Sequence, residues 1–115
     1  MSEHDMNFPP PEQFPEYGKD FDLSSDPHAV YQILDVRRRL DGLIEVDSVR
    51  RGPSGIDYSE RLIDPSAQTF AYTRHAETHA GFVETESKQV GEMAAFVEGS
   101  ISDLICRHVW RLVRN

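Results

Sequence analysis

The most constraining feature of this sequence is an apolar stripe at helical spacing in its last third. Side chains three and four residues apart fall on one side of a helix with about 3.6 residues per turn. The stripe consists of Val90, Met93, Ala94, Val97, Ile101, Leu104, Ile105, His108 and Leu112. This pattern predicts one long C-terminal helix packed on a core. The alternative is a helix broken at Gly99-Ser100, because Ser100 and Asp103 have the spacing of a capping box.

The end of this segment carries more apolar side chains than the stripe contains. The additional ones are Cys106, Val109, Trp110 and Val113, which alternate with Arg107, Arg111 and Arg114. One small core cannot cover a helix that is apolar on several sides, so we predict that this helix binds a partner protein or a second copy of the chain. Buried Trp and Arg side chains dominate many interfaces. We therefore expect Phe96, Trp110 and Val113 to make the contact, with Arg107 and Arg111 at its rim.

Residues 1–25 differ in composition from the rest of the chain. Prolines, acids and aromatic residues follow one another there without helical or alternating periodicity. Such a composition is typical of disordered segments, so we predict a disordered Pro-rich leader followed by a single domain over residues 26–115. The leader contains Phe8 and Phe14. These aromatic side chains are candidate anchors for a partner, and the alternative is a solubilising extension.

The middle of the chain predicts one helix and several strands. Asp26-Pro27 resembles a helix start, and the apolar spacing from Val30 to Leu40 predicts a helix over about 27–41. Alternating patterns then predict strands around 43–49, 56–62 and 69–73, and a possible fourth near 81–85. The turn residues Gly52-Pro53-Ser54-Gly55 join the first two strands as a hairpin. The predicted fold class is α+β, with an N-terminal helix, a three- or four-stranded antiparallel meander and a long C-terminal helix packed on the sheet.

Composition excludes several classes of partner. The formal net charge is −8, and the pI is about 5.0. Nucleic acids and anionic membrane surfaces attract positive fields, so we expect neither as a partner. No apolar run reaches the length of a membrane-spanning helix. Cys106 is the only cysteine, so no intrachain disulfide can form and a reducing cytoplasm is the expected compartment.

One polar cluster suggests a metal site. On a strand, His75, Glu77 and His79 would project from the same face. Two imidazoles and one carboxylate are ligands that zinc or iron accepts. The alternative is a hydrated polar face of the sheet, and the spacing matches no known zinc motif of the HExxH type.

These observations favour a non-enzymatic binding protein that requires no cofactor. The candidate roles are adaptor, inhibitor, immunity-type protein, chaperone or accessory subunit, with the last helix and the leader as binding segments. Two alternatives remain open from the sequence. One is a small metal-binding domain or metal-dependent enzyme that uses His75, Glu77 and His79, and the other is a self-assembling homo-oligomeric subunit.

Overall fold

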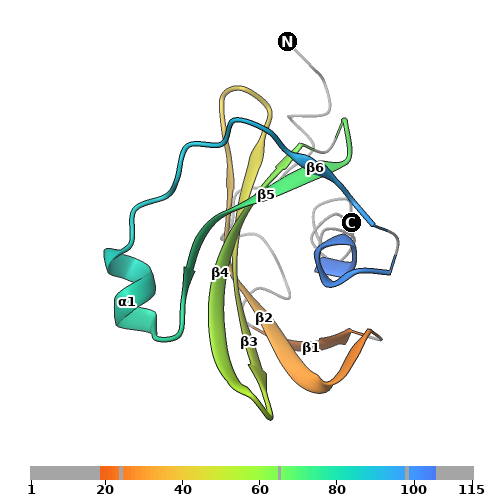
Figure 1. The fold of residues 1–115 in the computed structure, drawn as a ribbon, viewed down its shortest axis with the longest axis vertical. Helices are drawn as coiled ribbons and strands as arrows, with labels where there is room; N and C mark the ends of the chain where they lie inside the picture. The colour runs from red at the N-terminus through yellow and green to blue at the C-terminus, as the bar shows by residue number, and fades with distance from the viewer. Residues whose placement is uncertain (1–18, 24, 65, 98, 106–115) are drawn as a thin grey trace.

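The computed structural model describes residues 19–23, 25–64, 66–97 and 99–105. These residues form one curved antiparallel sheet whose strands follow one another in chain order (Figure 1). The strands are β1 (Asp20–Leu23), β2 (Asp26–Arg38), β3 (Ile44–Gly52), β4 (Gly55–Asp64), β5 (Thr69–Ala76) and β6 (Ala94–Ala95). Two short helices complete the described part of the chain, α1 (His79–Glu84) and a turn and a half at 101–105.

The predicted N-terminal helix over 27–41 is wrong, because this segment forms β2. The side chains of Ala29, Tyr31 and Ile33 alternate into the core, and aromatic and β-branched residues of this kind favour strands. The register shifts between Ile33 and Asp35, so Val36 is the next buried residue on that face. This bulge breaks the alternation and imitates helical spacing in the sequence. Asp26 does not cap a helix and instead accepts a hydrogen bond from Arg50.

The prediction of a long C-terminal helix is also wrong over the part of this segment that the structure describes. Residues 85–93 have no helical structure, and Ala94–Ala95 pair with β5 as β6. The helix at 101–105 starts after Gly99, whose φ of +81° suits glycine. The amide of Asp103 donates to the Ser100 hydroxyl at 3.2 Å, and its carboxylate accepts from Gly99 N at 2.9 Å. The α+β description with a long helix is therefore replaced by a predominantly β fold.

The hairpin and the third strand of the prediction are confirmed. β3 and β4 pair without interruption from Ile44↔Ile63 to Gly52↔Gly55, and β5 covers the predicted stretch 69–73. The possible strand near 81–85 is wrong, because His79–Glu84 form α1. Thr78 caps this helix by accepting a hydrogen bond from Gly81 N at 3.0 Å. β1, which lies within the stretch assigned to the leader, pairs with β2.

The two faces of the sheet have different contents. The sheet curves around the helix at 101–105, whereas α1 lies on the opposite, outer face (Figure 1). The main core fills the inside of the curve and includes Tyr31, Ile33, Val46 and Ile105. On the outer face, Phe82 of α1 packs on Tyr58 with ring centroids 5.9 Å apart. Within the described ranges, no helix has the length and apolar character needed to cross a bilayer.

Candidate ligand-binding site

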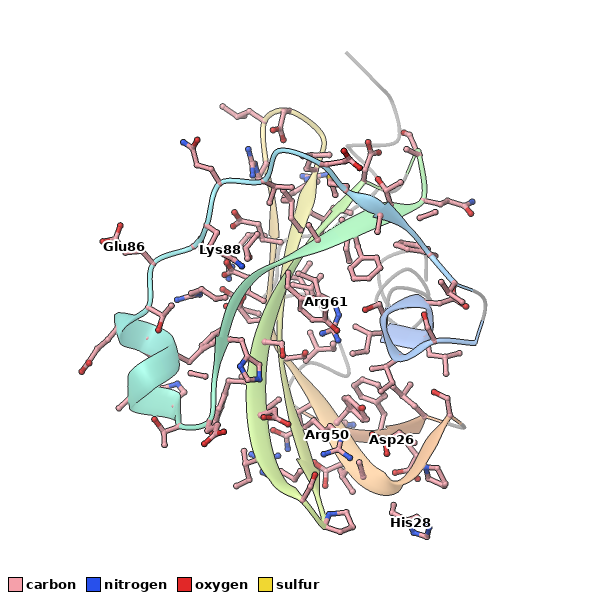
Figure 2. All side chains as sticks on the ribbon, in the orientation of Figure 1. Asp26, His28, Arg50, Arg61, Glu86 and Lys88 are labelled. Carbon is pink, nitrogen blue, oxygen red and sulfur yellow. The ribbon has the colours of Figure 1, made fainter. Side chains whose placement is uncertain are left out.

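Arg61 is a buried cation on the inner face of the sheet. It lies in β4 and points into the curve toward the helix at 101–105 (Figure 2), and only 3% of its surface is exposed. Its guanidinium donates from Nε to Ser102 Oγ at 3.2 Å, from Nη1 to Ser48 Oγ at 3.1 Å and from Nη2 to Tyr72 OH at 3.1 Å. These partners are neutral hydroxyls, and no carboxylate of the described residues is among them. Burying a cation without an opposite charge is costly, so this arrangement requires an explanation.

The local sequence accounts for the position of Arg61. Residues on a strand alternate between the two faces, so Arg61 shares the inner face with Ser59 and Ile63. Its register partner in β3 is Val46, and its partner in β5 is Tyr72. The guanidinium carbon lies 4.8 Å from the centroid of the Tyr72 ring. This cation–π contact holds the side chain in place without neutralising it.

A cavity of about 470 Å³ lies beside Arg61 on the inner face. Its lining residues come from β2, β3, β4, β5 and the start of the last helix. They are Tyr31, Ser48, Arg50, Asp57, Ser59, Arg61, Tyr72, His75 and Ile101. At the more exposed end, the side chains of His75 and Asp57 are 56% and 39% exposed, and His75 Nε2 lies 3.3 Å from Asp57 Oδ1. The cavity therefore runs from a buried cation to a partly exposed acid–imidazole pair.

Arg50, the second arginine of the cavity, already has an acidic partner. Its Nε and Nη2 donate to the carboxylate of Asp26 at 2.7 and 3.3 Å, and the two residues lie together in Figure 2. The Tyr31 hydroxyl donates to the same carboxylate at 2.7 Å. Hydrogen bonds from Arg50 and Tyr31 lower the pKa of Asp26, and burial raises the pKa of Tyr31 to about 12. The charge of Arg50 is thus compensated within the protein, in contrast to that of Arg61.

The outer face carries a second charged cluster, which is centred on Glu60 and is extensively hydrogen-bonded. Glu60 Oε2 accepts from Arg37 at 2.6 Å and from Arg74 at 2.7 Å. Its Oε1 accepts from Thr73 at 2.7 Å and also from Ser87. The register shift of β5 opposite Glu60 lets both Thr73 and Arg74 reach this carboxylate.

Asp47 is the neighbour of Glu60 in β3, and the two acids have opposite pKa shifts. Asp47 accepts two hydrogen bonds from Arg37, at 3.0 and 3.1 Å. Burial is the main cause that raises the pKa of Asp47 to about 6. Burial also acts to raise the pKa of Glu60, but the hydrogen bonds from Asp47, Ser87, Arg74 and Thr73 together lower it to about 2. The arginines and carboxylates of this cluster compensate one another, which is typical of a structural ion network.

The three predicted metal ligands lie on different elements. His75 belongs to β5 and contacts Asp57, Glu77 follows the strand, and His79 opens α1 with its ring 5.6 Å from Tyr58. Among the residues that the structure describes, no group of three His, Cys, Asp or Glu side chains is arranged to hold a metal ion. The structure therefore does not bring His75, Glu77 and His79 together as one ligand set.

The predicted partner-binding residues are described only in part. Phe96 is half-buried and packs on Phe70, with ring centroids 5.9 Å apart. The others, Trp110, Val113, Arg107, Arg111, Phe8 and Phe14, lie outside the described residues. Association through the C-terminal segment or the leader stays a prediction.

The burial of Arg61 among hydroxyl groups is not among the predictions made from the sequence. A weak signal was present, because Arg61 shares its strand face with Ser59 and Ile63 and not with Glu60. Comparison of the chain with protein-family models, with curated proteins and with solved structures finds no match.

Proposed function

We propose that this protein binds a small organic carboxylate in the cavity beside Arg61. The observation that carries the proposal is the burial of the Arg61 guanidinium among neutral hydroxyls, without an acidic partner in the described part of the chain. A bound anion would supply the missing negative charge. A buried polar group that lacks its usual partner within a protein is a candidate for binding an ion or ligand.

The chemistry of the cavity favours a planar oxyanion attached to an apolar body. A guanidinium has five N–H donors, and Arg61 uses three of them for the hydroxyls of Ser48, Tyr72 and Ser102. Its remaining donors suit a carboxylate, which arginine recognises through a flat fork. Tyr31, Tyr72 and Ile101 line the cavity with aromatic and aliphatic surface. The volume of about 470 Å³ lies within the range of small-molecule sites, which is about 300–1,000 Å³.

The test compares phenylpropanoate with its uncharged amide by isothermal titration calorimetry. We expect the carboxylate to bind about 10- to 100-fold more tightly, because hydrogen bonds to charged groups contribute about 1.5–3 kcal/mol. Arg61→Met should remove this preference. It should also leave the free energy of unfolding unchanged or raise it, since an apolar side chain often replaces a buried charge without loss. Arg51→Met, on the opposite face of β3, is the matched control and should bind like the unmodified protein.

A purely structural role for Arg61 gives a different result. In that case Arg61→Met would be strongly destabilised, and the unmodified protein would not distinguish acid from amide. Tyr72→Phe provides a second, milder variant, because it removes only the hydroxyl that accepts from Nη2. We expect this variant to remain folded and to change the affinity for phenylpropanoate but not the binding-site stoichiometry.

A further inference from the structure

The cavity differs in charge at its two ends, and this difference defines the ligand more closely. We propose that the carboxylate ligand also carries a hydrogen-bond donor, a hydroxyl or amino group, at its far end, and that Asp57 accepts this group. The inference rests on the carboxylate-binding function proposed above. It identifies the ligand class as aromatic or cyclic acids with a donor opposite the acid group.

The spacing along β4 sets the length of such a ligand. Arg61, Ser59 and Asp57 occupy alternate positions of the strand and line the same cavity. At about 3.3 Å per residue, the Cα atoms of Arg61 and Asp57 lie about 13 Å apart. The Arg61 side chain points away from the sheet toward the helix at 101–105, so this spacing approximates the distance between the two groups that would hold the ligand ends. It suits one ring with a short chain, flanked by the side chains of Tyr31 and Tyr72.

The contacts of Asp57 leave room for a donor. Its register partner is Arg50, but both Arg50 Nε and Nη2 donate to Asp26. Among the described residues, the Asp57 carboxylate contacts His75, with Asp57 Oδ1 3.3 Å from His75 Nε2. A carboxylate accepts several hydrogen bonds, so Asp57 has acceptor capacity beyond this one contact.

The same contacts disfavour other ligand ends. An apolar end would remove water from Asp57 without replacing its hydrogen bonds, which is unfavourable for an ionised group. A second carboxylate would lie next to the negative charge of Asp57. A hydroxyl or amino group instead forms a charge-assisted hydrogen bond, the stronger class of such bonds.

The experiment uses three probes that differ only at the ring position opposite the acid chain. They are para-hydroxyphenylpropanoate, para-methylphenylpropanoate and para-carboxyphenylpropanoate, each titrated by calorimetry into the full chain and into Asp57→Ala. We expect the hydroxyl compound to bind about tenfold more tightly than the methyl compound, and the diacid to bind most weakly. In Asp57→Ala the hydroxyl and methyl compounds should bind with equal affinity, because the hydroxyl loses its acceptor and the methyl group no longer removes water from a carboxylate. Asp41→Ala, an acid on the exposed turn between β2 and β3, should leave all three affinities unchanged.

Other results would contradict either the two-ended ligand or the carboxylate-binding function, and the two cases differ. Equal binding of the hydroxyl and methyl compounds by the full chain, or tightest binding of the diacid, would overturn the two-ended ligand. If both compounds still depended on Arg61, the carboxylate-binding function would stand. An equal loss of affinity for both compounds in Asp57→Ala would show that Asp57 only supports the cavity. Absence of binding by every probe, or binding that survives Arg61→Met, would instead refute the proposed function itself.

Discussion

Replacing Glu60 by alanine is expected to lower the free energy of unfolding by about 3–5 kcal/mol, the usual cost of breaking a buried ion pair. Glu60 is 1% exposed and accepts hydrogen bonds from two arginines, Arg37 and Arg74. Its removal takes one carboxylate partner from each guanidinium group, and the two arginines then share Asp47. Thr73 and Ser87 also lose their shared acceptor, so a polar network that was satisfied becomes partly unsatisfied.

Urea denaturation followed by circular dichroism at neutral pH measures this loss. The matched control is Glu45→Ala, because Glu45 also binds Arg37, at 2.9 Å, but its side chain is 27% exposed. Partly exposed pairs contribute about 0–1 kcal/mol, so the control should lose far less stability. Glu60→Gln should fall between the two, since an amide keeps the shape and part of the hydrogen bonding. Equal losses for Glu60→Ala and Glu45→Ala would contradict a buried network centred on Glu60.

The unmodified protein should lose stability as the pH rises from about 4 to 6, and we expect the Asp47→Asn variant to lack this loss. Burial raises the pKa of Asp47 from 3.8 to about 6, so the folded protein binds its proton more tightly than the unfolded chain does. The stabilisation is therefore present below about pH 4 and is lost as the pH rises through 6. A difference of this size corresponds to about 3 kcal/mol. Asparagine resembles the protonated acid, so the variant should be more stable than the unmodified protein at pH 7, by up to that amount.

Glu60 produces the opposite slope at lower pH. Its pKa falls from 4.5 to about 2 on folding, so its stabilisation is present above about pH 4.5 and is lost as the pH falls toward 2. The combined stabilisation from Asp47 and Glu60 should therefore be largest near pH 4. Chemical denaturation at pH values from 3 to 8 tests this profile, with Asp41→Asn as a control on an exposed pair. If the free energy of unfolding of Asp47→Asn changed with pH in the same way as that of the unmodified protein, Asp47 would not be the cause of the loss of stability above pH 4.

Local patterns predicted the parts of the fold in which one segment determines its own structure. The turn residues from Gly52 to Gly55 and the alternation on either side of them suffice for the β3–β4 hairpin. The Ser100–Asp103 spacing likewise marks a helix start that the structure contains. The prediction of a helix over 27–41 failed because a bulge changes the phase of β2 between Ile33 and Asp35. Only pairing with β3 reveals that phase change.

The candidate site shows the same division between local and tertiary information. Alternation along β4 already places Glu60 and Arg61 on opposite faces, and this follows from the sequence alone. Tertiary structure decided the surroundings of each charge. Glu60 meets two arginines, whereas Arg61 meets hydroxyls, including that of Ser102 from a segment far along the chain. The period of a strand is a property of consecutive residues, but the compensation of a buried charge depends on distant residues that only folding brings together.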